Sequence, residues 1–257
     1  MEPERLDLPD GRRIAYARAM GGGPGIVFLG GFRSDMTGTK ATFLEDRARA
    51  QGRAFLRFDY TGHGASSGAF EEGCIGDWAQ DATDALDRLS EGPQILVGSS
   101  MGGWIALLVG LRRPERVAGI VGIAAAPDFT EDAMWDGADD AQKARLMGEG
   151  RLELPSAYSD GPYVITRRLI EDGRERLVLR TPLRLGCPLR LLHGTADADV
   201  AASVALRLLA HAEGPDVRLT LVKDADHRFS APDNLELIAA TVDELGRAPL
   251  AGDGARG

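Results

Sequence analysis

Short β-type segments alternate with helical segments along most of this chain. The strand candidates are apolar runs bounded by turn residues, at residues 25–29, 54–58, 94–97, 117–123, 189–192 and 217–222. Helical patterns lie between these strands, at residues 39–51, 75–89, 101–111 and 200–212, and after the last of them, at residues 232–245. Strands separated by helices pair in parallel, because each helix crosses over a face of the sheet. The alternation therefore predicts an α/β fold with a mostly parallel central sheet and helices on both faces.

An antiparallel hairpin is expected ahead of this sheet. Residues 5–8 and 12–17 flank Pro9-Asp10-Gly11, a tripeptide typical of turns. With 257 residues, of which 44% are hydrophobic, the chain is long enough to bury one sizeable core. We expect a single core domain made of residues 1–127 and 187–246.

Two regions depart from the alternation. Residues 128–186 form a long connection with scattered helical patterns, prolines that include Pro155 and Pro162, and several large apolar side chains. Because an ordered connection of this length is more often functional than idle, we expect a lid or cap inserted over the sheet. Residues 247–257 are rich in Gly and Ala and predict a disordered tail.

The charge balance narrows the range of partners. Thirty basic against 39 acidic residues give a formal net charge of -9, whereas proteins that bind nucleic acids normally carry a basic face. We therefore expect no nucleic-acid partner. The longest apolar stretches, residues 104–111 and 117–126, are shorter than the roughly 20 residues that a membrane helix needs, so no membrane insertion is expected.

The two cysteines, Cys74 and Cys187, predict neither disulfides nor a metal site. They are too few for a disulfide framework, and their spacing suits neither a metal site nor a CxxC pair. They are interpreted as packing thiols in a reducing compartment. Residues 1–5 resemble neither a signal peptide nor a mitochondrial presequence, so the expected location is the cytoplasm.

The segment Gly98-Ser99-Ser100-Met101-Gly102 matches the pattern G-x-S-x-G and lies directly between a predicted strand and a predicted helix. A sharp turn at this point strains the backbone of the serine, and the strand and helix approach so closely that glycine is needed two residues away on either side. Ser100 has glycine at both places. Ser99 has Val97 and Met101 there, so Ser100 is the predicted nucleophile.

A serine hydroxyl needs a neighbouring imidazole to accept its proton. His227 follows the last predicted strand and precedes the last helix, which places it at the same sheet edge as Ser100, and it is the predicted base. His211 lies near the end of an amphipathic helix and is expected to be a helix-end residue. His193 ends a strand before Gly194 and is expected to be structural.

The imidazole in turn needs an acid that fixes its tautomer and stabilises the imidazolium. Asp197, on the loop after residues 189–192, is the favoured candidate. Asp199 on the same loop and Asp128 after an earlier strand remain alternatives. The chain order Ser100, Asp197, His227 is the order expected for a hydrolase built on this type of sheet.

Acyl transfer also needs two backbone donors for an oxyanion. One candidate is the amide of Met101, at a helix N-terminus whose dipole favours negative charge. The other is the amide of Phe32, after the Gly-rich turn that follows residues 25–29. The turn at residues 59–66 is interpreted as architectural, with His63 only near the site. The Gly-rich turn after residues 25–29 contains neither a phosphate-binding G-x-x-x-x-G-K-[ST] string nor a G-x-G-x-x-G string.

The whole core from residue 25 to about 245 resembles the α/β-hydrolase superfamily. Closer similarity is to the branch of mitochondrial palmitoyl-protein thioesterases and acyl-glucuronide esterases of animals and their bacterial relatives. The segments that carry it are Phe58-Asp59-Tyr60, residues 92–104 around the nucleophile, residues 188–194 and Asp226-His227-Arg228. The resemblance implies a triad of Ser100, Asp197 and His227 and an oxyanion hole of Phe32 and Met101.

These observations favour a serine hydrolase that cleaves carboxylic esters or thioesters through an acyl-enzyme. Hydrolysis of C–C or amide bonds on the same triad is the alternative, and a non-catalytic binding protein is a third. The chemistry requires no cofactor and no metal. The expected partner is a small-molecule or acylated substrate, and the sequence leaves the oligomeric state open.

The composition of residues 128–186 bears on the acyl group. Large apolar residues there predict a pocket for an acyl chain of medium length or longer, unless these residues only anchor the lid to the core. The large apolar residues are Met134, Trp135, Leu146, Met147, Leu152, Leu154, Tyr158, Tyr163, Val164 and Ile165.

Overall fold

Eight strands form the central sheet, in the spatial order β1-β2-β4-β3-β5-β6-β10-β12. Their bounds are β1 Glu4–Asp7, β2 Arg13–Ala19, β3 Gly22–Leu29, β4 Arg53–Phe58, β5 Gln94–Ser99, β6 Val117–Ile123, β10 Leu189–Gly194 and β12 Val217–Val222. The hairpin β1–β2 and the pair β2–β4 are antiparallel, and every pair from β4 to β12 is parallel. The prediction of a mostly parallel sheet with an antiparallel entry hairpin is confirmed. The computed structural model describes residues 3–154 and 163–247.

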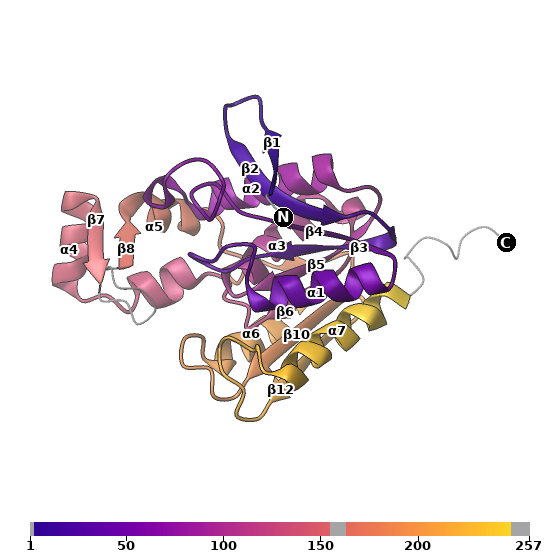
Figure 1. Ribbon diagram of the computed structural model, residues 1–257. Helices are drawn as coiled ribbons and strands as arrows, with labels where there is room; N and C mark the ends of the chain where they lie inside the picture. The colour runs from indigo at the N-terminus through magenta and orange to yellow at the C-terminus, as the bar shows by residue number, and fades with distance from the viewer. Residues whose placement is uncertain (1–2, 155–162, 248–257) are drawn as a thin grey trace.

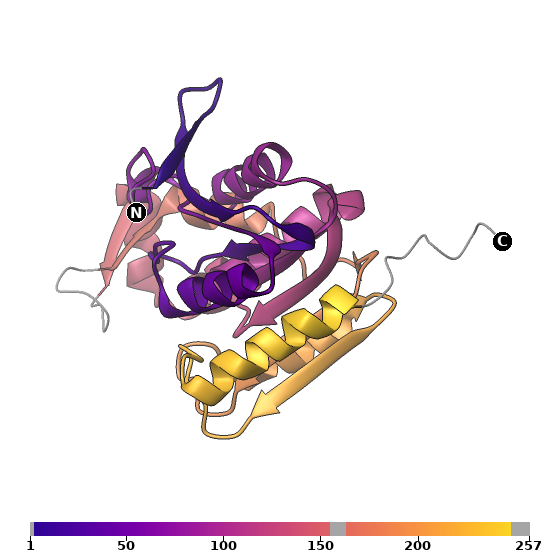
Figure 2. The same ribbon diagram turned by 45° about the vertical axis from the view of Figure 1, so that its right-hand side comes forward.

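Helices cover both faces of the sheet (Figures 1 and 2). One face carries α1 (Thr39–Ala50) and α7 (Pro232–Arg247), whose apolar side chains share one core cluster with the sheet. The other face carries α2 (Ile75–Leu89), α3 (Met101–Arg112) and α6 (Ala202–His211), which pack in a second cluster. Since residue 247 ends α7, only residues 248–257 of the predicted tail lie outside the described residues.

Helix α3 is buried on nearly all sides, and its sequence requires this. Every residue from Met101 to Gly110 is buried, including Trp104. A helix that is apolar all round is stable only inside a core, here between the sheet and α2. No helix in the described part of the chain is long and apolar enough to cross a membrane.

Residues 128–186 fold into a π-helix η3 (Thr130–Trp135), helix α4 (Asp140–Glu149), the antiparallel hairpin of β7 (Arg151–Leu154) and β8 (Tyr163–Thr166), and helix α5 (Arg167–Arg174). In Figure 1 these elements lie together at the left, beyond the main sheet. The short elements that remain are η1 (Phe70–Glu72), η2 (Pro114–Arg116), and β9 (Leu183–Arg184) paired with β11 (Ala212–Glu213).

The inserted segment has a small core of its own. Leu146, Leu152, Ile165 and Ile170 pack together and are almost fully buried, with Met134 and Trp135 against them. Of the apolar residues that predicted an acyl pocket, several therefore anchor the segment to itself. Tyr158 lies outside the described residues.

The crossing between β5 and α3 is the tightest packing near the sheet edge. A Cβ on Gly98 would lie 2.2 Å from the carbonyl oxygen of Gly102, and a Cβ on Gly102 would lie 2.1 Å from the carbonyl oxygen of Leu29. Real Cβ atoms do not approach backbone oxygens this closely. Strand and helix meet here only because both positions lack a side chain.

We predict that Gly98→Ala lowers the free energy of unfolding by more than about 3 kcal/mol, because one added methyl group forces the backbone of β5 away from α3. Gly148→Ala is the matched control. Gly148 lies within α4 with open space around its Cβ position, so alanine there should raise stability by about 0.5–1 kcal/mol. Urea unfolding of both variants measures the difference, and equal stabilities would contradict the tight crossing.

Candidate active site

Ser100 lies between β5 and α3 in a strained backbone conformation. Its φ angle is +54° and its ψ angle is -118°. A non-glycine residue at positive φ costs of order 1–3 kcal/mol and persists only where its surroundings hold it. The Ser100 amide donates to the carbonyl of Ile123 (2.9 Å), and its own carbonyl accepts from Gly103 (2.9 Å) and Ala126 (3.1 Å). These bonds from both neighbouring elements fix the serine at the sheet edge.

The two predicted oxyanion donors lie on segments that adjoin Ser100. Met101 is the first residue of α3, where an amide N–H has no partner within the helix. Gly31, which precedes Phe32, has its Cβ position 3.6 Å from the Cβ of Ser100. The turn after β3 therefore passes directly beside the serine, as the sequence predicts.

His227 and Asp197 are hydrogen-bonded to each other. The distance from His227 Nδ1 to Asp197 Oδ2 is 2.8 Å, and the Asp197 side chain is fully buried while that of His227 is 22% exposed. The other carboxylate oxygen of Asp197 accepts from the amides of Asp199 (2.9 Å) and Val200 (2.8 Å). Because an ionised carboxylate only accepts, Nδ1 carries the proton and the Nε2 lone pair is left as the acceptor.

His193 of β10 and His211 of α6 have different surroundings. His193 is 1% exposed, and its Nε2 lies 2.8 Å from the carbonyl oxygen of Val200 and 3.5 Å from Asp197 Oδ2. It packs behind the acid, which agrees with the structural role expected for it. His211 ends α6, and its Nε2 lies 2.6 Å from the carbonyl oxygen of Thr181.

Asp128 binds the inserted segment. Its fully buried carboxylate accepts from the amides of Val178 (2.8 Å) and Leu179 (3.0 Å) and from the Arg180 guanidinium (3.2 Å). Burial raises the pKa of Asp128, and this effect is larger than the opposite effect of the hydrogen bonds and of Arg180, which lower that pKa. Its oxygens are thus used to join the two ends of residues 128–180, whereas Asp197 contacts the histidine.

All six non-glycine residues with positive φ in the described part of the chain lie in loops that follow strands of the main sheet. They are Arg33 after β3, Ser100 after β5, Ala124 and Asp128 after β6, and Asp224 and Phe229 after β12. Parallel strands end at one common edge, so the backbone strain collects around Ser100 and His227. Strain of this kind clusters at functional sites.

A cluster of apolar side chains surrounds the Phe32 ring. That ring makes edge-to-face contacts with Phe70 (centroids 4.8 Å apart), Trp78 (5.7 Å) and Phe129 (5.6 Å). Phe32, Phe70, Phe129 and Met134 are only partly buried against the core beneath them. An apolar surface thus extends from the loop beside Ser100 towards the inserted segment.

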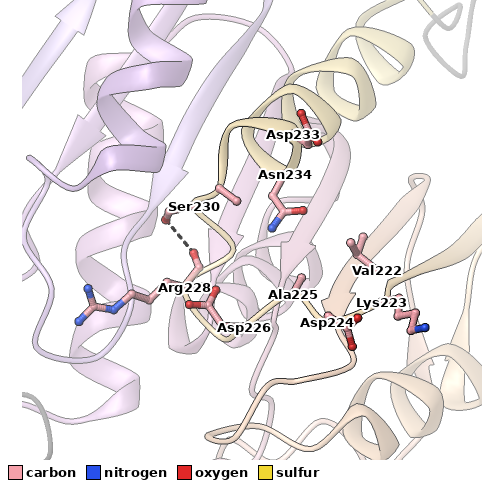
Figure 3. Close-up of a pocket in the computed structure, with 10 residues that line it drawn as sticks. Val222, Lys223, Asp224, Ala225, Asp226, Arg228, Ser230, Asp233 and Asn234 are labelled. Atoms are coloured by element: carbon pink, nitrogen blue, oxygen red, sulfur yellow. Dashed lines mark hydrogen bonds between the residues drawn. The ribbon is translucent and has the colours of Figure 1, made fainter.

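A cavity of about 560 Å³ lies along the loop between β12 and α7, the loop that carries His227. Figure 3 shows the residues that line it. Its charged residues have mixed signs, with Arg228 at one end and Lys223 at the other, and Ser100 does not line it. Lys40 of α1 donates to the carbonyl of Arg228 (2.5 Å) and so ties this loop to the core. Burial lowers the pKa of Lys40 to about 8.

Two further groups bear on the chemistry. In the described residues, Asp197, Asp199 and His227 are a trio whose possible metal-ligand atoms lie within 4.8 Å of one another. A metal there would compete with the His227–Asp197 hydrogen bond. Burial raises the pKa of Cys74 to about 12 and that of Cys187 to about 11, so neither thiol is a nucleophile at neutral pH.

Sequence reasoning missed how the turn after β4 supports the site. His63, interpreted as lying only near the site, is 4% exposed and accepts a hydrogen bond from the amide of Arg33 (3.3 Å). Burial lowers its pKa to about 4. The available signal was a polar cluster, Asp59 to His63, directly after a buried strand.

Known proteins share both the sequence and the fold. A family model described as "alpha/beta hydrolase fold" matches residues 27–156. The mitochondrial palmitoyl-protein thioesterase ABHD10 of Rattus norvegicus is 39% identical over 94% of this chain and 80% of its own length, and that of Homo sapiens is 36% identical over 93% and 78%.

Two solved structures superpose on nearly the whole chain. A putative hydrolase from Agrobacterium vitis S4 has a TM-score of 0.90 and 41% identity, covering 95% of this chain and 98% of the other. The alpha/beta hydrolase domain-containing protein 10 from mouse has a TM-score of 0.88 and 36% identity, with the same coverage. The chain is therefore a member of the α/β-hydrolase family and an enzyme of the group that contains the ABHD10 thioesterases.

Proposed function

We propose that this protein hydrolyses carboxylic esters or thioesters through an acyl-enzyme, with Ser100 as nucleophile, His227 as base and Asp197 as the acid that orients it. The observation that carries the proposal is the 2.8 Å bond between His227 Nδ1 and fully buried Asp197. This bond fixes the tautomer of His227 in which Nε2 can accept a proton. The loop of His227 lies at the same edge of the sheet as the strained backbone of Ser100.

In the acylation step, Ser100 Oγ attacks the carbonyl carbon of the substrate while His227 Nε2 takes the hydroxyl proton. The carbonyl electron pair moves onto oxygen, and the amides of Phe32 and Met101 stabilise that negative charge. The tetrahedral intermediate then collapses, the bond to the leaving thiolate or alkoxide breaks, and His227 returns its proton to the leaving group.

In the deacylation step, a water molecule repeats the sequence. His227 removes a proton from the water as its oxygen attacks the acyl-enzyme, and the same two amides bind the second oxyanion. Collapse releases the carboxylic acid and restores the Ser100 hydroxyl with the proton from His227. Asp197 stays ionised and stabilises the imidazolium in both steps.

The acyl group is proposed to be of medium length or longer. The partly exposed apolar group of Phe32, Phe70, Phe129 and Met134 supports this, because it begins at the loop that would bind the oxyanion. The thioesterases that the chain resembles are named for palmitoyl-protein substrates. A fatty acyl thioester is therefore the substrate class that we propose.

Ser100→Ala should remove nearly all turnover with the fold intact, a loss that reaches about a millionfold for triad residues. A fluorophosphonate probe should label the native protein at Ser100. Ser99→Ala is the matched control, since Ser99 has Val97 and Met101 in place of the two glycines that flank Ser100, and it should keep both labelling and turnover. Substantial turnover in folded Ser100→Ala would refute the proposed nucleophile.

Asp197→Asn should lower kcat by roughly ten-thousandfold, because an amide at this position favours the wrong tautomer of His227. Asp128→Asn should keep kcat and lose about 1–3 kcal/mol of stability, because its carboxylate holds backbone amides. Kinetics and thermal unfolding of both variants distinguish these roles. A larger loss of kcat in Asp128→Asn would assign the acid to Asp128.

Substrates of increasing chain length with one leaving group test the acyl preference. From acetyl through butyryl to octanoyl, kcat/KM should rise, because each buried methylene contributes roughly 0.8 kcal/mol, or about fourfold. Phe129→Ala should reduce the value for octanoyl more than that for acetyl, whereas Leu206→Ala, on the exposed side of α6, should change neither. A steady fall from acetyl to palmitoyl would identify a small-ester hydrolase instead.

A further inference from the structure

The loop from Gly30 to Met36 contains Phe32, the proposed second oxyanion donor. Besides the ring contacts of Phe32, the loop makes hydrogen bonds with side chains of one neighbouring segment. Two of the contacts are at its ends. The amide of Met36 donates to Asp59 Oδ1 (2.6 Å), and the hydroxyl of Tyr60 donates to the carbonyl of Gly30 (3.4 Å). Arg57 also donates to the carbonyl of Met36 (2.8 Å). All three side chains come from the end of β4 and the turn that follows it.

The contact nearest to Phe32 is made by His63. Its Nε2 accepts from the amide of Arg33 at 3.3 Å, and its Nδ1 lies 3.3 Å from the carbonyl oxygen of Thr61. A carbonyl only accepts, so Nδ1 carries the proton and Nε2 is a bare acceptor. The ring is therefore a neutral imidazole with both nitrogens engaged, one in its own turn and one in the loop.

Two properties indicate that this contact determines the loop's geometry. Arg33 has a φ angle of +57°, a conformation that needs support from its surroundings. The His63 ring is fixed on several sides by edge-to-face contacts with Tyr60 (5.5 Å), Phe70 (5.0 Å) and Trp78 (5.1 Å). A rigid ring can hold a strained residue in place, and the amide of Phe32 lies one peptide unit before the bonded amide of Arg33.

We propose that His63 is a positioning residue that, through the amide of Arg33, aims the Phe32 amide at the oxyanion. This inference rests on the proposed acyl-enzyme mechanism. His63 touches neither nucleophile nor substrate in this role. Its contribution belongs to the transition state, because only there does the substrate oxygen carry the charge that the amide binds.

The test replaces the imidazole of His63 with an aromatic ring that has no hydrogen-bond acceptor. His63→Phe keeps a ring of similar size and its aromatic contacts but removes the bond from Arg33. We expect kcat to fall roughly tenfold to hundredfold with KM changed less than about threefold, the pattern for a misplaced transition-state donor. His211→Phe is the matched control, because His211 bonds Thr181 on another loop, and it should leave both constants unchanged.

Rescue separates positioning from packing. The Oε1 atom of a glutamine occupies about the same place as Nε2 of a histidine, so His63→Gln should accept the Arg33 amide and recover most of kcat. A trifluoromethyl ketone forms an oxyanion adduct with the serine, so its Ki in His63→Phe should rise by the factor that kcat/KM falls. Unchanged kcat in folded His63→Phe, or equal losses in both variants, would overturn the positioning role.

Measurements on the unmodified protein cover the case in which these variants fail to fold. The ¹⁵N shifts of the His63 ring should show a protonated Nδ1 and an unprotonated, hydrogen-bonded Nε2 at neutral pH. A protonated Nε2 would overturn the inference. Labelling of Ser100 by a fluorophosphonate tests the acyl-enzyme mechanism separately, so a failed mechanism and a failed role for His63 give different results.

Discussion

The left-handed backbone of Ser100 is the constraint on which the rest of the site depends. This conformation places the serine at the end of β5 and brings α3 so close to the strand that Gly98 and Gly102 leave no room for side chains. Side chains at the end of β4 and in the turn after it hold the loop that follows β3 by hydrogen bonds. The backbone of Ser100 is bonded to Ile123 of β6 and to Ala126. Helix α3, which is buried from Met101 to Gly110, supplies the rigid support that a strained turn requires.

The sequence predicts the core well because the signals there are local. Most of the parallel strands are short runs rich in apolar residues, and the glycine spacing around Ser100 describes the same crossing that the structure contains. The pairing of His227 with Asp197 follows from chain order, since loops after parallel strands meet at one edge. These features require no knowledge of which distant residues touch.

The sequence predicts less where contacts between distant segments decide the outcome. The hairpin of β7 and β8 has few residues, and its apolar side chains, such as Leu152 and Ile165, are those expected to line a pocket. Their burial in a separate small core depends on α4 and α5. The acids Asp59, Asp128 and Asp197 all follow strands, and only the partner amides and imidazole distinguish their roles.

The hydrogen bonds that Asp128 accepts from Val178 and Leu179 have a consequence for how the inserted segment can change. They join the start of the inserted segment to its end, so that about 50 residues leave and re-enter the core at nearly one point. A segment closed at its base and stabilised by its own apolar cluster changes in length or sequence with little effect on the sheet. Substitutions in this segment can therefore change its surface while the sheet edge that carries Ser100 and His227 keeps its geometry.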